Sequence, residues 1–150
     1  REVSKFLVNQ FWPNTKEKQL DFVKNSLRSN NDRLIFSICL KKNDRHIGQC
    51  SLSSINWVHR FADIAILIGE KKFRKSLISL EAYRLLLEIA FDRFNLNNIK
   101  SAMANPGVEK IHQLLGFKLV GTYKDLFLID NKKFSMKLYI MNKLMWNKKK

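Results

Sequence analysis

The sequence has few cysteines, histidines, prolines and glycines, and these shortages exclude several classes of protein. The only cysteines, Cys39 and Cys50, stand inside apolar, strand-like segments, so the chain has no disulfide framework and no zinc-binding spacing. His46, His59 and His112 have no second ligand at helical spacing, which disfavours a metal site. We therefore expect buried thiols, no metal and a reducing, cytoplasmic location.

Long hydrophobic runs and a signal peptide are also lacking. No apolar run is long enough to cross a bilayer, so we expect no membrane partner. The chain begins at Arg1 without Met, and we expect that the natural N-terminus is not fully represented. With 150 residues, of which 45% are hydrophobic, the chain has the size and composition of one folded domain.

Acidic residues are scarce relative to basic ones. There are 28 Lys and Arg against 13 Asp and Glu, which gives a formal net charge of +15. Such a charge favours anionic partners, among them cofactor phosphates, nucleotide-linked substrates and nucleic acid. Nucleic acid is the less favoured of these, because no interleaving of aromatic and basic residues marks an RNA-binding platform. The alternative is that the charge reflects a biased composition rich in Lys, Asn, Ile and Phe.

The hydrophobic pattern predicts a mixed sheet with helices on both faces. Asn14, as N-cap, and Glu17 indicate a first helix that ends in the polar turn at 29–32. Ser79 is the expected N-cap of a second helix over 80–94, and a third spans 108–115. The nearly continuous apolar run at 62–68 is typical of a central strand covered on both faces. The other predicted strands cover 34–40, 47–55, 99–104, 118–123 and 134–141.

A glycine-free loop joins the strand at 62–68 to the second helix. A strand, a charged loop and a helix in this order form a phosphate site, because the helix N-terminus offers unpaired N–H groups and a positive dipole end. The loop reads Arg74-Lys75-Ser76-Leu77-Ile78-Ser79. Its charge favours a bound phosphate, whereas its lack of glycine argues against close approach to the backbone.

The order and spacing of three segments resemble the GCN5-related N-acetyltransferase (GNAT) superfamily. The segments are 73–83, Asn105 and the Leu-Leu-Gly-Phe sequence at 114–117. The resemblance is closest to the branch that contains ribosomal-protein-alanine acetyltransferases, runs from about Val3 to Trp146 and lacks only the superfamily's first strand. It implies one acetyltransferase-like domain over residues 1–150, of the α/β (α+β) class. Its sheet would be mixed and mostly antiparallel, with a V-shaped cleft between the two central strands.

The resemblance also implies acetyl-CoA as the cofactor. The pantetheine arm would lie between the central strands, and the pyrophosphate would lie on the loop. The residues implied for the arm are Ile66, Leu67, Ile68 and Asn105. The residues implied for the pyrophosphate are Arg74, Lys75, Ser76, Leu77, Ile78 and Ser79. For Asn105 the alternative is an Asx-turn before Pro106. Leu77 stands where relatives have a small residue, so we expect its side chain to clash and Leu77→Gly to tighten binding.

Two residues are implied as catalytic. Asp63, at the start of the central strand, matches a carboxylate that positions or deprotonates the acceptor amine, with Glu70 as second choice. His112, four residues before Gly116, occupies the place of a Tyr that protonates the departing thiolate, and an imidazole has a suitable pKa for that step. The alternative for His112 is packing within the domain.

The leading hypothesis is an N-acetyltransferase that uses direct attack of a primary amine on the thioester. The amine would belong to a small molecule, a sugar or a protein N-terminus, and a homodimer is left open. The alternative is a non-catalytic acyltransferase-like module that binds an anionic partner, which the missing glycines and the positive charge favour.

Overall fold

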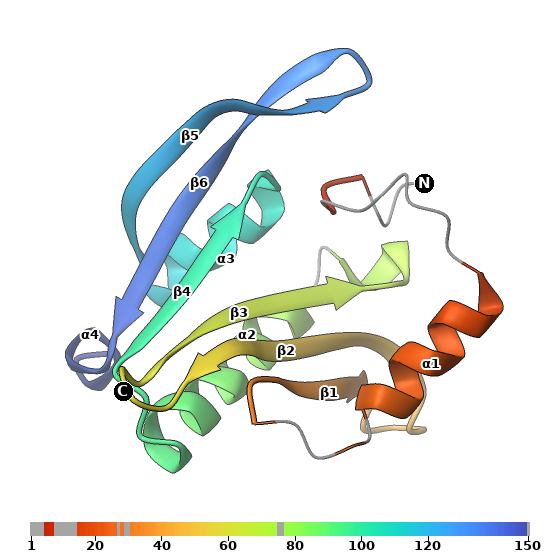
Figure 1. Ribbon diagram of the computed structural model, residues 1–150, viewed down its shortest axis with the longest axis horizontal. Helices are drawn as coiled ribbons and strands as arrows, with labels where there is room; N and C mark the ends of the chain where they lie inside the picture. The colour runs from red at the N-terminus through yellow and green to blue at the C-terminus, as the bar shows by residue number, and fades with distance from the viewer. Residues whose placement is uncertain (1–4, 8–14, 27, 29–30, 75–76, 150) are drawn as a thin grey trace.

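Within the part of the chain that the structure describes, six strands form one sheet in the order β1-β2-β3-β4-β6-β5 (Figure 1). The computed structural model describes residues 5–7, 15–26, 28, 31–74 and 77–149, so the predicted N-cap Asn14 lies outside the described residues. The strands are β1 Leu34–Cys39, β2 His46–Asn56, β3 Phe61–Ile68, β4 Asn98–Met103, β5 Lys118–Ile129 and β6 Lys132–Asn142. The helices are α1 Lys16–Ser26, α2 Ile78–Glu88, α3 Pro106–Leu115 and α4 Lys143–Asn147, with short turns η1 Lys71–Phe73 and η2 Ile89–Arg93.

The sheet splits between its two central strands. All neighbouring strands are antiparallel except β3 and β4, which are parallel. Within the described residues these two strands pair at only three positions, the last being Asp63 with Lys100. Beyond that pair β3 continues beside β2 and β4 continues beside β6, and the strands diverge (Figure 1). The predicted V-shaped cleft is confirmed.

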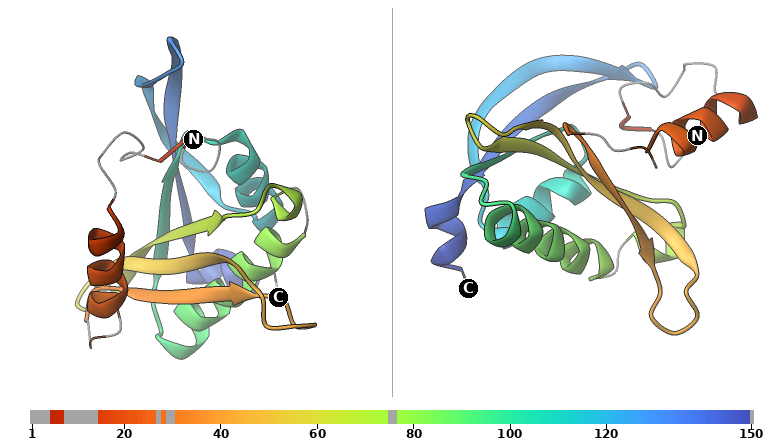
Figure 2. Two further views of the ribbon diagram at one scale, coloured as in Figure 1. Left: turned by 90° about the vertical axis from the view of Figure 1, so that its right-hand side faces the viewer. Right: turned by 60° about the horizontal axis from the view of Figure 1, so that its bottom comes forward.

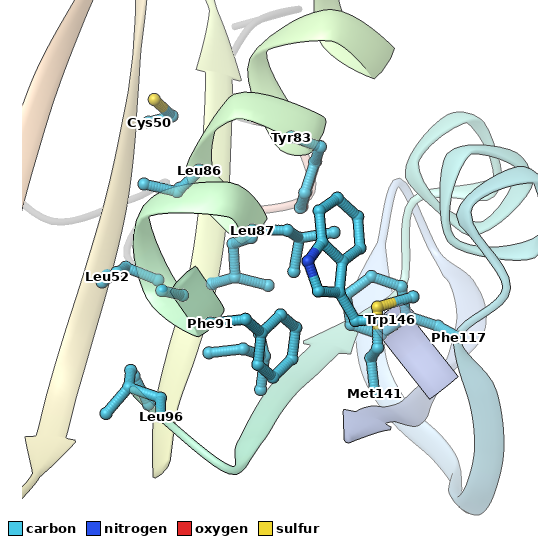
Figure 3. Packing of buried hydrophobic residues seen from close by; sticks show 14 of the residues in the cluster. Cys50, Leu52, Tyr83, Leu86, Leu87, Phe91, Leu96, Phe117, Met141 and Trp146 are labelled. Carbon is cyan, nitrogen blue, oxygen red and sulfur yellow. The ribbon is translucent and has the colours of Figure 1, made fainter. Parts of the chain in front are cut away.

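One face of the sheet carries the hydrophobic core. Helices α2 and α3 lie against this face, and α1 lies against the other (Figure 2). Residues of α2 at i, i+3, i+4, i+7 and i+8 face the strands, which is the spacing of an amphipathic helix; they are Ser79, Ala82, Tyr83, Leu86 and Leu87. Trp146 of α4 stacks on Phe91 with ring centroids 6.0 Å apart and closes the end of the core (Figure 3).

The other face of the sheet is largely uncovered, which corrects one prediction. Helix α1 has no buried residue, and along β3 the buried Ala62 and Ile64 alternate with the half-buried Asp63 and the exposed Ala65. The run at 62–68 is therefore covered on one face only, and Asp63, Ala65 and Leu67 lie on the other.

Several boundaries differ from the sequence-based ones. The second helix ends in a π-helical turn, in which the Phe94 amide donates to the Ile89 carbonyl 3.0 Å away. Strands β5 and β6 are longer than predicted and form an arm that projects from the domain around the turn at Asp130 and Asn131 (Figure 1). Gly116 ends α3 with φ 87, as expected for a left-handed C-cap.

Gly48 lets β2 approach β3 closely. It pairs with Ile68, and a Cβ at this position would overlap the carbonyl oxygen of Leu67. Any larger residue would therefore push the end of β3 away from β2.

None of the helices within the described residues is both long and apolar enough to cross a membrane.

Candidate active site

A cavity of about 320 Å³ lies beside the end of β3 that has separated from β4. It is lined by β3, by the start of α2 and by the start of α3. Six of the ten residues predicted to bind the cofactor meet there, namely Ile66, Leu67, Ile68, Arg74, Ser79 and Asn105. Gly107, Val108 and Ile111 of α3 complete the wall together with Phe6, which the sequence patterns did not single out.

Arg74 ties the loop to the end of β3. Its Nε donates to the carbonyl of Ile68 at 3.2 Å, and its Nη2 donates to the carbonyl of Gly69 at 2.8 Å. Both acceptors are neutral, so these contacts orient the guanidinium at the cavity without neutralising its charge. An anion that entered the cavity would meet this charge.

The N-terminus of α2 opens beside the same cavity. Helix α2 begins at Ile78 with Leu77 as N-cap, and no side chain caps it. The predicted N-cap Ser79 is wrong by two residues; Ser79 is buried inside the first turn and lines the cavity. The amide of Glu81 donates to the carbonyl of Leu77 at 2.9 Å, and the N-terminus of an α-helix directs its first amides and the positive end of its dipole toward an anion. Lys75 and Ser76 lie outside the described residues.

Leu77 does not cover these amides. Its backbone is right-handed, with φ −68 and ψ −5, and its side chain is 77% exposed. The position therefore needs no glycine for its backbone angles. The side chain thus points into solvent, which argues against the clash expected from the sequence.

We predict that Leu77→Gly weakens acetyl-CoA binding slightly rather than tightening it. Glycine costs about 0.5–1 kcal/mol of loop order, which corresponds to a loss of affinity of at most about fivefold. Calorimetry of Leu77→Gly beside Leu77→Ala separates the two explanations. If both variants bind more tightly than the parent, the side chain does obstruct the site and the structural argument fails.

Asn105 caps α3 at the edge of the cavity. Its Oδ1 accepts from the amide of Gly107 at 2.9 Å, and Pro106 occupies the first helical position. The Asx-turn is therefore confirmed. Because Asn105 also lines the cavity, its contact with the pantetheine arm stays a prediction.

His112 is buried among aromatic rings. Ring centroids of Tyr83, Phe117 and Tyr139 lie 5.1, 4.4 and 5.5 Å from its own. Its Nδ1 lies 2.8 Å from the carbonyl oxygen of Val108, which can only accept, so Nδ1 carries the proton and Nε2 is left with a lone pair. Within the described residues that Nε2 has no hydrogen-bond partner. His112 is not among the residues that line the cavity, and its catalytic role stays a prediction.

Burial of His112 predicts a loss of stability in mild acid. Desolvation lowers the pKa of His112 below its ordinary value, although the hydrogen bond to Val108 opposes this shift. The unfolded chain then binds a proton that the folded chain resists. The stability present above about pH 6.5 is lost as the pH falls from there through the lower folded pKa. Urea unfolding between pH 7.5 and pH 5 should show this loss, and His112→Phe should reduce it; an equal slope in both proteins would contradict the assignment.

Asp63 stands at the fork of the two central strands. It faces away from the core and from His112, because its neighbours Ala62 and Ile64 point toward α2. Its Oδ1 lies 3.5 Å from Nζ of Lys100. The two predicted catalytic residues thus lie on opposite faces of the sheet. This arrangement suits Asp63 as a base for the amine and His112 as an acid for the thiolate if the acetyl donor and the acceptor enter from different sides.

Glu70, the second choice for a base, is engaged in ion pairs. Its carboxylate lies 2.9 Å from Arg45 and 3.7 Å from Lys72. Because Glu70 lies beyond the far end of β3, it is remote from the fork.

A charged cluster beside α3 was missed by sequence reasoning. Glu109 Oε1 accepts hydrogen bonds from Lys137 and, at 3.0 Å, from the hydroxyl of Tyr139. The Lys137 contact holds the pKa of Glu109 below its ordinary value. Lys137 and Tyr139 lie 28 and 30 residues away from Glu109 in the sequence, so no local sequence pattern connects them. Only the pairing of β4 with β6 reveals the cluster.

No group of His, Cys, Asp or Glu suited to a metal ion occurs within the part of the chain that the structure describes.

A family model of the GNAT acetyltransferase domain matches residues 1–118. The chain belongs to this family, and GNAT acetyltransferases use acetyl-CoA as the acetyl donor. It is accordingly an N-acetyltransferase by family.

Solved structures of acetyltransferases share the fold. The spermidine N-acetyltransferase of Vibrio cholerae in complex with CoA and spermine is 18% identical to this chain, with a TM-score of 0.84. The alignment covers 97% of this chain and 85% of the Vibrio cholerae chain. A structure described as a probable acetyltransferase is 21% identical over 97% of this chain and 82% of its own, with a TM-score of 0.82. At such identities the likeness establishes the fold alone. No match was found among curated proteins. The ribosomal-protein-alanine branch stays a prediction.

Proposed function

We propose that this chain transfers the acetyl group of acetyl-CoA to a primary amine that carries few positive charges. The observation that supports this most is the cavity beside the end of β3 that is not paired with β4, where this strand, a helix N-terminus and Arg74 meet. Acetyl-CoA, when bound, supplies an activated thioester carbonyl. The acceptor class goes beyond what the family and the fold establish.

The residues present fit the proposed donor. From Ile64 to Ile68, β3 has no pairing with β4 among the described residues, so its inner edge offers backbone groups to an extended arm. The N-terminus of α2, with the positive end of the helix dipole, and the charge of Arg74 suit the pyrophosphate. The cavity volume of about 320 Å³ lies within the usual range of ligand sites.

Direct attack by the amine is favoured over an acetyl-cysteine. Cys39, which is exposed and not buried as the sequence predicted, lines a different cavity together with Cys50, between β1, β2 and α2. Burial raises the pKa of Cys50 to about 11, so its thiol is a poor nucleophile at neutral pH. Asp63, on the uncovered face, is the group proposed to receive the amine proton.

The carboxylates near the cleft argue against a polycationic acceptor. Asp63, Glu70 and Glu109 each already contact a lysine or an arginine. A polyamine would have to displace these partners and enter a chain of charge +15. We therefore propose an amine on a neutral or anionic molecule, although the Vibrio cholerae structure above holds spermine.

Calorimetry with acetyl-CoA tests the proposal. We expect micromolar binding by the parent chain and none by Val108→Trp, which would fill the cavity. The matched control is Leu114→Trp on the exposed side of the same helix, where the parent side chain is 58% exposed. If the parent does not bind acetyl-CoA, the non-catalytic alternative is favoured. Release of CoA with glucosamine but not with spermidine would support the acceptor class, and the reverse would contradict it.

A further inference from the structure

We propose that the chain acetylates its own Lys100 when no other amine is present. This inference rests on the proposed function, because it requires acetyl-CoA in the cleft. We infer self-acetylation from the position of Lys100, whose amine lies where an acceptor amine would have to lie.

Lys100 stands at the point where the cleft begins. Asp63 and Lys100 form the last paired position of β3 and β4, and beyond them the strands diverge. The side chain of Lys100 faces away from the core, since its neighbours Ile99 and Ser101 are buried. A thioester at the apex of the cleft would therefore have this side chain as a near neighbour on the uncovered face.

Two groups hold the Lys100 amine there. Its Nζ lies 3.5 Å from Oδ1 of Asp63 and 4.5 Å from the ring centroid of Phe61. A carboxylate together with an aromatic ring is the usual pair of groups that binds an ammonium ion. The amine of Lys100, from the same chain, thus already occupies the site proposed for the acceptor amine.

Other paired lysines lie elsewhere in the described part of the chain. Lys72 contacts Glu70 past the end of β3, and Lys137 contacts Glu109 on the side of α3. Lys5 contacts Asp130 at the tip of the arm. Among these pairs Lys100 alone stands at the fork, and its side chain is 45% exposed, so it is free to shift.

The reaction balances without a further reactant. The ammonium of Lys100 gives one proton to Asp63, and the neutral nitrogen attacks the thioester carbonyl carbon. A C–N bond forms, the C–S bond breaks, and the electron pair leaves on sulfur, which takes the second proton lost by the nitrogen to give free CoA. The proton on Asp63 then passes to water. Holding the amine at the site replaces a bimolecular encounter by an intramolecular one.

Acetylation would change the site that it occurs in. It removes the positive charge of Lys100, so both the contact with Asp63 and the cation–π contact with Phe61 are lost. Asp63 would then be free to receive an external amine. Self-acetylation would thus prepare the base for other acceptors.

The test measures acetyl groups on the full chain by peptide mass spectrometry after incubation with acetyl-CoA alone. We expect Lys100 to be acetylated at least about tenfold faster than Lys118, an exposed lysine of β5 that reports chemical background. Asp63→Asn should slow the Lys100 reaction by about 10²-fold and leave Lys118 unchanged. Lys100→Arg should remove the signal at that peptide only.

Calorimetry on the same samples separates the possible failures. If acetyl-CoA binds but Lys100 reacts no faster than Lys118, self-acetylation is wrong and the proposed function stands. If acetyl-CoA does not bind, both are wrong. Loss of the Lys100 signal in Val108→Trp, together with a preserved signal in Leu114→Trp, would tie the reaction to the cavity.

Discussion

Replacing Asp63 with asparagine is expected to lower turnover of an external amine by about 10²–10⁴-fold. The affinity for acetyl-CoA should stay within about twofold, because Asp63 faces away from the cavity that would hold the donor. Turnover measurements, together with calorimetry, check each part.

The stability of the Asp63→Asn variant should change little. The Asp63 and Lys100 side chains are 39% and 45% exposed, and such exposed pairs contribute about 0–1 kcal/mol. Glu88→Gln is a matched control, since it removes an exposed carboxylate paired with Arg84 at 3.6 Å on the far side of α2. Equal turnover in the two variants would mean that Asp63 is not the base.

Replacing His112 with phenylalanine is expected to slow turnover by about 10²-fold while the chain remains folded. A flat apolar ring suits the surroundings of Tyr83, Phe117 and Tyr139, and it removes the unpartnered Nε2. Turnover and thermal unfolding are measured on the same preparation, so that a change in rate is not confused with a loss of folded protein.

His112→Tyr is the informative companion, because it differs from His112→Phe by one hydroxyl. The neutral ring keeps its proton on Nδ1, so His112 can protonate the thiolate only after Nε2 has bound a proton. If it does so, tyrosine should restore much of the rate that phenylalanine loses. If both variants turn over like the parent, His112 only packs within the core, and water or another group protonates the thiolate.

The sequence was sufficient for the fold and for the location of the cleft. The apolar strands around Ile66 and Met103, with the break at Asn105 and Pro106, predict two strands that part before their ends, and the register confirms it. Such features are local, since periodicity and turn residues act within a few positions of the chain.

Features that depend on long-range packing were not predictable. The exposure of Leu77 depends on where the helix starts, and that start was misplaced at Ser79. The burial of His112 depends on Tyr83 and Tyr139, which come from other elements. The uncovered face of β3 was also missed, because an apolar run does not reveal whether the helix opposite it packs tightly.

Gly48 helps to determine the width of the cleft although it lies on the far side of β3 from the cleft. Gly48 contacts β3 on the edge away from β4, and no residue larger than glycine fits there without moving Leu67 and Ile68. Those two residues form part of the cavity wall on the other edge of the same strand. A substitution at Gly48 would thus narrow the entrance for the donor from outside the site. Gly48 is therefore a position at which mutation would impair this enzyme, although a map of ligand contacts would not include it.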